Sequence, residues 1–130
     1  MTEYRVLHIG IASREAIKRR TIAIAKGEIR PGPDDPQVWF TSFESLGKVL
    51  SGSNMLLLEI IRNDRPRSVG ELARLTGRAK SNLSRTLSHM ERLGLVEMRA
   101  EDNRKVPTVN YDRLQFEFAL DGGPSAMAAA

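Results

Sequence analysis

The segment Ser68–Val96 constrains the fold of this chain more than any other part of the sequence. It reads SVGELARLTGRAKSNLSRTLSHMERLGLV, and Ser68 and Glu71 have the spacing of a capping box at a helix start. Gly77 and Gly94 follow the two helix-periodic runs and suit the left-handed position that ends a helix. The segment therefore predicts a helix-turn-helix, a motif that places its second helix in a DNA major groove.

The second of these helices, expected over residues 79–93, has two unlike sides. Leu83, Leu87 and Met90 cluster on one side, which predicts a core-facing stripe. The other side carries arginine, asparagine and serine, whose side chains can bind guanine, adenine and phosphate. We predict that the first turns, which enter the groove most deeply, supply base and nearby phosphate contacts. These residues are Lys80, Ser81, Asn82, Ser84 and Arg85, while Ser88 continues the stripe and Arg78 and Arg92 contact the phosphate backbone. The alternative is that the stripe only faces solvent, with Ser81 or Asn82 capping the helix.

A hairpin is expected after this helix. Leu95–Arg99 and Val106–Tyr111 are β-prone runs on either side of AEDNRK, which predicts a tip made of Asp102, Asn103, Arg104 and Lys105, with Asn103 making the turn. Such a hairpin is the wing of a winged helix, so Arg104 and Lys105 are predicted to reach phosphates or a minor-groove edge. The helix before Ser68 is MLLLEIIRND, with Ser53 or Asn54 as its expected cap.

The flanking residues predict a second set of elements. Apolar alternation indicates strands over residues 4–11, 37–41 and 114–120, the last pairing with the first. Helices are expected over residues 13–26 and 42–50, separated by the proline-rich loop Gly27–Pro36. Trp39, Phe40 and Phe43 are expected to anchor a core or a dimer contact.

The predicted fold class is α+β: a winged helix-turn-helix with an N-terminal strand-helix-strand extension and a C-terminal strand. Residues 1–50 form the extension, expected to make a dimer or partner contact, and residues 51–112 form the DNA-binding domain. Residues 113–120 form the C-terminal strand, and residues 121–130 are expected to be a disordered tail.

Charge and composition narrow the classes of function. The chain has 20 basic and 16 acidic residues, and 11 of the basic but 6 of the acidic residues lie between Arg62 and Lys105. This local surplus suits a polyanionic partner such as double-stranded DNA. Cysteine is absent and the two histidines have no paired spacing, so we predict no metal site and no cofactor. No catalytic constellation is visible, so we predict no enzyme. No apolar run approaches the roughly 20 residues of a membrane span, and no signal peptide is seen, which predicts a cytoplasmic protein with no membrane partner.

Residues 68–96 and the hairpin after them resemble the MarR-like winged-helix transcriptional regulators. The segments VWFTSFESLGKVLS and VPTVNYDRLQFEF, with the N-terminal strand and helix, resemble a family of small prokaryotic and archaeal DNA-binding proteins. Its members are transcriptional regulators or antitoxins found beside a TumE-type toxin. The resemblance implies a DNA-binding homodimer that represses its own operon, together with a toxin partner. It places Ser81, Asn82, Ser84 and Arg85 in the reading turns and Arg104 and Lys105 in the wing.

Three hypotheses follow for the function. The first is a sequence-specific, homodimeric DNA-binding regulator, because one winged helix reads only a few base pairs and a second copy supplies another half-site. The second is an antitoxin that chiefly binds and neutralises a cognate toxin. The third is a ligand-sensing regulator, although the sequence contains no recognisable pocket motif.

Overall fold

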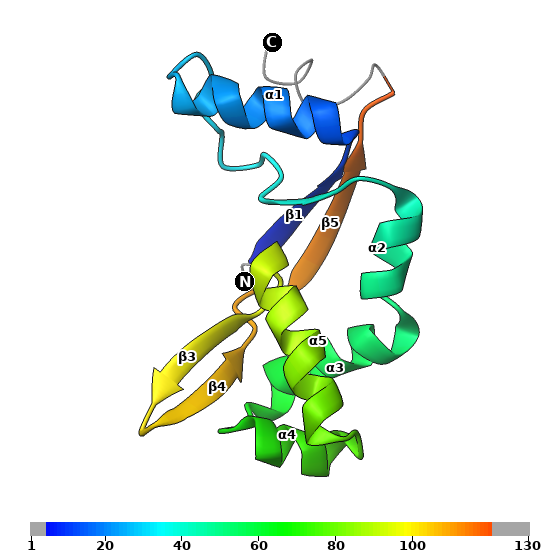
Figure 1. Cartoon of the computed structure of the whole chain (residues 1–130), viewed down its shortest axis with the longest axis vertical. Coiled ribbons are helices and arrows are strands. Elements are labelled where there is room, and N and C mark those ends of the chain that lie inside the picture. Colours follow the sequence, from blue (N-terminus) through cyan, green and yellow to red (C-terminus); the bar gives the residue numbers. More distant parts are fainter. Residues whose placement is uncertain (1–4, 121–130) are drawn as a thin grey trace, which may run out of the picture. The chain divides into compact units, whose positions relative to one another are not determined.

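The structure, a computed structural model, describes residues 5–120 of the 130-residue chain (Figure 1). It contains two compact units. The winged-helix unit comprises residues 49–110, and the sheet unit comprises the described residues up to 48 together with those from 111 onwards. The expected disorder of residues 121–130 lies outside the described residues.

The winged-helix unit consists of three helices followed by an antiparallel hairpin. The helices are α3 (Gly52–Asp64), α4 (Val69–Thr76) and α5 (Lys80–Leu93), and the hairpin strands are β3 (Glu97–Glu101) and β4 (Arg104–Thr108). Leucine, isoleucine and methionine side chains from all three helices form its core, with exposures of 5% or less: Leu57, Leu58, Ile61, Leu72, Leu83, Leu87 and Met90. The predicted α+β class with a winged helix-turn-helix is confirmed.

The helix ends of this unit show why the helix-turn-helix could be predicted from the sequence. The Ser68 hydroxyl accepts a hydrogen bond from the Glu71 N–H at 3.0 Å, and the Glu71 carboxylate accepts one from the Arg67 N–H at 3.2 Å. Gly77 and Gly94 have φ angles of 72° and 92°, which non-glycine residues adopt only at a cost. These local signals fix both ends of α4 and the end of α5, whereas α5 begins after Ala79, which makes no side-chain cap hydrogen bond.

The start of α3 differs from the prediction of Ser53 or Asn54 as its cap. Ser51 is the N-cap, because its extended backbone lets its hydroxyl accept the Asn54 N–H. Asn54 lies inside the helix, and its side chain donates to the Val49 carbonyl at 2.8 Å. Serines 51 and 53 and Asn54 are all good capping residues, so local preference alone did not decide among them.

The hairpin turn is tighter than the predicted four-residue tip. Asp102 and Asn103 both have positive φ, 48° and 62°, which a two-residue type I′ turn requires and which aspartate and asparagine tolerate. Asn103 therefore makes the turn as predicted, together with Asp102. Arg104 and Lys105 lie within β4, opposite Glu101 and Ala100.

The sheet unit is built around a central strand, β1 (Val6–Ile11). It pairs in parallel with β2 (Val38–Phe40) on one side and with β5 (Arg113–Phe118) on the other, in the order β2-β1-β5. Figure 1 shows β1 and β5 side by side, which confirms that the C-terminal strand pairs with the N-terminal one. Helix α1 (Arg14–Ala25), capped by Ser13, connects β1 to β2, and α2 (Phe43–Val49) follows β2.

The two faces of the sheet are packed differently. Ile9, Val38 and Phe40 are at most 3% exposed on one face. On the other, Gly10 leaves room for the Trp39 ring, because a Cβ atom at Gly10 would lie 2.3 Å from Trp39 Cζ3. The Arg20 guanidinium of α1 lies 5.8 Å from the Trp39 ring centroid, so the Arg20 side chain covers the Trp39 ring on this second face. Phe40 and Trp39 thus act as core anchors, whereas Phe43 is 59% exposed.

The buried Arg20 has a carboxylate partner. Its Nη2 donates to Asp35 Oδ2 at 3.1 Å, and the Gly32 N–H donates to the same oxygen at 2.8 Å. The Gly32 hydrogen bond and then the Arg20 guanidinium hold the pKa of Asp35 below its usual value, against the opposing effect of desolvation. The proline-rich loop is thereby fastened to α1.

Candidate nucleic-acid interface

Helix α5 presents opposite sides to the core and to solvent. Leu83, Leu87 and Met90 are no more than 1% exposed. The predicted reading side is exposed along the helix, through Lys80, Ser81, Asn82, Ser84, Arg85, Ser88 and Arg92. The predicted division of the helix into a core stripe and an exposed stripe is confirmed, while DNA contact by the exposed stripe stays a prediction.

Several predicted site residues have no side-chain partner among residues 5–120. The cations Lys80, Arg85, Arg104 and Lys105 are exposed, and no hydrogen bond or ion pair holds them to another residue of that range. Arg92 differs, since its Nη2 lies 3.4 Å from His89 Nδ1. A guanidinium without an intramolecular hydrogen bond can donate all its N–H groups to a guanine edge or a phosphate.

Arg78 has an intramolecular role that the sequence did not indicate. Its Nη1 donates to Asn54 Oδ1 on α3 at 3.2 Å, and its Nη2 donates to Asn82 Oδ1 at 2.7 Å and to Thr86 Oγ1 at 3.4 Å on α5. The partly buried guanidinium therefore links the helix that supports α5 to the first two turns of α5. The contribution of Asn54 and Thr86 was missed, because Asn54 lies 24 residues before Arg78 and nothing in the spacing joins them.

These contacts limit which hydrogen bonds the Asn82 side chain could make with DNA. Its Oδ1 also accepts from Arg78 Nε at 3.2 Å, so two donors already point at this oxygen. A bidentate contact with adenine needs Oδ1 as an acceptor and Nδ2 as a donor. With Oδ1 occupied, the Nδ2 group remains as a donor for a base acceptor or a phosphate.

Replacing Arg78 with alanine is expected to lower the free energy of unfolding of the winged-helix unit by about 1–2 kcal/mol, because Asn54 and Asn82 lose a charged donor. Arg78→Lys should cost nearly as much, since one ammonium group cannot span the same three acceptors. Urea unfolding measures both variants. Arg74→Ala, at an exposed position on α4, is the matched control and should be near neutral. A stable Arg78→Ala variant would show that these bonds contribute nothing.

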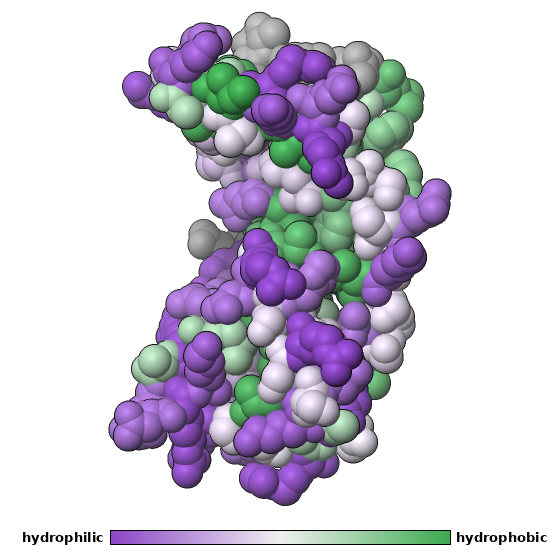
Figure 2. Space-filling model, viewed as in Figure 1, coloured by the Kyte–Doolittle hydropathy of each residue, from purple (hydrophilic) through white to green (hydrophobic). Residues whose placement is uncertain are grey.

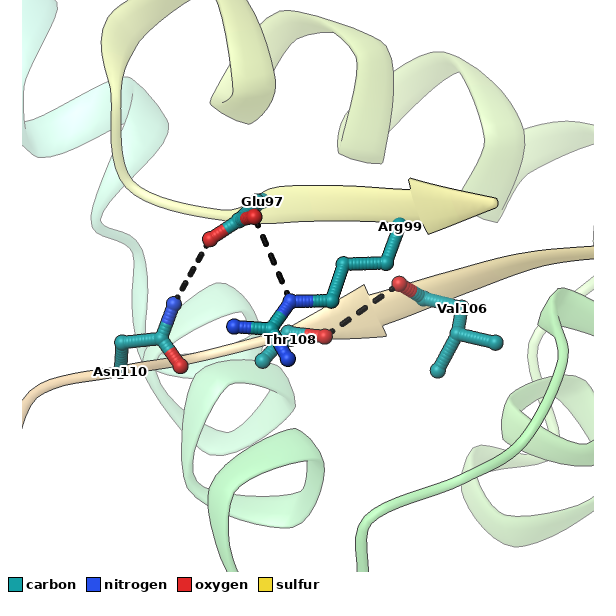
Figure 3. Close-up of polar contacts among 5 residues, drawn as sticks. All are labelled: Glu97, Arg99, Val106, Thr108 and Asn110. Atoms are coloured by element: carbon teal, nitrogen blue, oxygen red, sulfur yellow. Dashed lines mark hydrogen bonds and ion pairs between the residues drawn. The ribbon is translucent and has the colours of Figure 1, made fainter. Parts of the chain in front are cut away.

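Hydrogen bonds connect residues at the base of the wing (Figure 3). One Glu97 oxygen accepts from Arg99 Nε at 3.3 Å, and the other accepts from Asn110 Nδ2 at 2.8 Å, which ties β3 to the chain after β4. The Thr108 hydroxyl donates to the Val106 carbonyl. Sequence reasoning had not singled out Glu97 or Asn110.

Arg104 and Lys105 lie on opposite faces of the hairpin, since they are adjacent in β4. Lys105 shares a face with Met98 and the buried Pro107, and Arg104 shares the other with Glu101. A hairpin that enters a minor groove meets a phosphate backbone on either side. Opposite orientation of the two cations is suited to that arrangement, although both were predicted without regard to face.

The positive charge of the chain is concentrated in the winged-helix unit. Residues 49–110 contain 11 basic and 7 acidic residues, a net +4, whereas the remaining residues contain 9 of each. Figure 2 shows mostly hydrophilic residues over the wing, at the lower left of the view. The unit that exposes α5 thus carries the whole net charge of the chain.

Two further findings concern residues 5–120. No group of three or more histidine, cysteine, aspartate or glutamate side chains in this range is arranged to hold a metal ion. None of its helices combines the length and apolar character needed to cross a membrane.

The fold of residues 49–110 and the exposed side of α5 define a winged-helix protein. The chain belongs to the HVO_A0114 family, whose model matches residues 49–116, slightly more than half of the sequence. Among solved structures, it is similar to one described as the predicted DNA-binding transcriptional regulator from E. coli. That likeness has 22% identity and a TM-score of 0.46, and covers 72% of this chain and 84% of the other. No curated protein matches the chain.

Proposed function

We propose that this protein is a sequence-specific regulator of transcription that binds double-stranded DNA as a homodimer and represses its own operon. The observation that carries the proposal is the construction of α5. Its core side is buried, while Ser81, Ser84 and Arg85 are exposed on its N-terminal half, where a recognition helix meets base edges. The positive charge of the same unit supplies the attraction to phosphate.

In the proposed complex, the first turns of α5 lie in the major groove. Arg85 donates two hydrogen bonds to a guanine, and Asn82 Nδ2 and the serine hydroxyls bind base acceptors or phosphates. Lys80, Ser88 and Arg92 contact the flanking phosphates, and Arg104 and Lys105 of the wing contact the adjacent backbone. Arg78 acts as a positioning residue, because its guanidinium fixes α5 against α3.

A homodimer is proposed because one recognition helix specifies too few base pairs. Two copies related by a two-fold axis read two half-sites, which multiplies discrimination against random DNA. A dimer bound at its own promoter blocks transcription by occupying it. The half-sites should then form an inverted repeat with centres separated by about one helical turn, or a multiple of it.

Footprinting on the DNA upstream of the protein's own gene tests this function. We expect protection of an inverted repeat and, at about 150 mM salt, an affinity at least about 1,000-fold higher than for random duplex. The matched control is the same duplex with both half-sites scrambled, which should bind like random DNA. Equal affinity for all three duplexes would refute specific regulation.

A further inference from the structure

Strand β5 has a second edge that pairs with no other strand among residues 5–120. It lies at the end of the sheet, and its side chains are largely exposed on both faces. Phe116 and Phe118 are 48% and 50% exposed, and the ring of the 59%-exposed Phe43 meets Phe118 edge-on, with 5.2 Å between centroids. Figure 2 shows hydrophobic residues at the upper right, where β5 ends and α2 begins. An exposed strand edge beside an apolar face is a template for strand addition.

The backbone of β5 determines which residues would make hydrogen bonds at this edge. The His8 carbonyl accepts from the Gln37 N–H, so His8 and, by alternation, Val6 direct their backbone groups toward β2. Arg113 is registered opposite Val6 and donates its N–H to the Arg5 carbonyl just before β1, so Arg113 directs its backbone groups toward β1. Backbone direction alternates along a strand, so Gln115 and Glu117 also face β1. Leu114, Phe116 and Phe118 therefore direct their N–H and C=O groups to the outer edge.

The sequence of β5 is complementary to itself when it is run antiparallel. With Gln115 on a two-fold axis, Arg113 lies opposite Glu117 of a second copy, and Glu117 lies opposite the second copy's Arg113. Leu114 lies opposite Phe116 on the other face, and these two residues carry the outward backbone groups. Arg113 and Glu117 then occupy non-hydrogen-bonded positions of the antiparallel ladder, where the side chains of facing strands approach most closely.

We propose that the outer edge of β5 binds β5 of a second copy, antiparallel and centred on Gln115, and so joins two sheets into one. Two ion pairs between Arg113 and Glu117, four backbone hydrogen bonds and the apolar face of Leu114, Phe116 and Phe118 hold the copies together. This inference rests on the homodimer of the proposed function and identifies its surface. The short strand β2, three residues long, offers much less at the opposite edge of the sheet.

Charge exchange tests the pairing and its register. Arg113→Glu and Glu117→Arg each place like charges opposite one another twice, and each is expected to raise the dimer Kd by about 30-fold at low salt. The double variant restores both pairs and should dimerise within about threefold of the wild type. Mixing the two single variants should also restore dimers, because the mixed dimer has opposite charges at both positions. Light scattering across a concentration series, without DNA, measures the dimer Kd of each variant and of the mixture.

Matched controls make the same charge changes away from β5. Arg30→Glu and Glu28→Arg, at exposed positions of the sheet unit, should leave the dimer Kd unchanged. Gln115→Lys is an independent variant, since it places two positive charges across the axis without altering Arg113 or Glu117, and should also weaken the dimer. Circular dichroism checks that each variant folds.

A wild-type protein that stays monomeric overturns the inference, as do single variants that dimerise normally or a mixture that does not recover. These results are distinguishable from failure of the proposed function. If the charge variants change dimerisation as expected but the protein prefers no DNA sequence, the proposed function is wrong and the β5 interface is supported. If the protein binds its operator specifically but Arg113→Glu and Glu117→Arg leave the dimer Kd unchanged, only the proposed β5 interface is wrong.

Discussion

Replacing Arg85 with alanine is expected to weaken binding to the protein's operator by about 10- to 100-fold, the worth of a bidentate contact to guanine. Arg85 is exposed on the second turn of α5 and is not held by any residue from 5 to 120, so its removal should leave the fold intact. Binding to random duplex should fall much less, because there the side chain contributes only charge. Parallel titrations of operator and random duplex measure the two losses.

Lys105→Ala is the matched contrast, since it removes one positive charge from the wing. It should weaken binding to all duplexes by a similar factor and make the slope of log K against log salt shallower by about one. Arg85→Ala should instead reduce the ratio of operator to random affinity. If both substitutions lowered affinity equally for every sequence, neither residue would have the role assigned to it.

Gly10→Val is expected to lower the free energy of unfolding by about 1–3 kcal/mol, the usual cost of overpacking. Strand propensity predicts the opposite sign, because valine favours strands and glycine in a strand costs roughly 0.5–1 kcal/mol relative to alanine. Steric overlap decides the outcome: a Cβ atom would lie 2.3, 2.6 and 2.8 Å from three carbons of the Trp39 ring. Trp39 cannot retreat freely, because Arg20 covers it.

Thermal and urea unfolding measure this effect, and the sheet unit offers its own control. Gly47→Ala in α2 has no atom within 4 Å of the new Cβ and should stabilise by up to about 1 kcal/mol, as expected for alanine in a helix. Adding Trp39→Ala to Gly10→Val should remove the clash. The double variant should then lose less than the two single losses combined. A Gly10→Val protein as stable as the wild type would mean that the Trp39 ring moves without cost.

The helix-turn-helix was predictable from sequence because its signals are local. The Ser68–Glu71 box, the glycines at positions 77 and 94, and the leucine spacing of α5 act within a few residues of one another. Opposed apolar and polar sides follow from helix geometry alone. The β1–β5 pairing was also predicted, since an apolar-sided strand needs a partner and few candidates exist in so short a chain.

The contacts that hold α5 against α3 could not be predicted in the same way. Arg78 reads as one more cation before a recognition helix, and its bonds to Asn54 and Thr86 depend on how α3 and α5 pack. Glu97 likewise reads as a charged strand residue until the fold brings Asn110 beside it. Such partners are set by tertiary packing rather than by spacing, so Arg78 was assigned to phosphate contact with no intramolecular role. The faces of Arg104 and Lys105 were also missed, because the hairpin turn was drawn too long.

The sheet unit is discontinuous in sequence, because α2 leads into the winged-helix unit and the chain returns to β1 only at β5. On a ribosome, β1, β2 and all of α5 are therefore made before the strand that completes the sheet. A chain cut off within the wing would retain α5 but lack β5, which would leave one edge of β1 unpaired. Under the proposed pairing, only chains translated past Phe118 can form dimers, so incomplete translation products cannot compete with the full protein for a two-site operator.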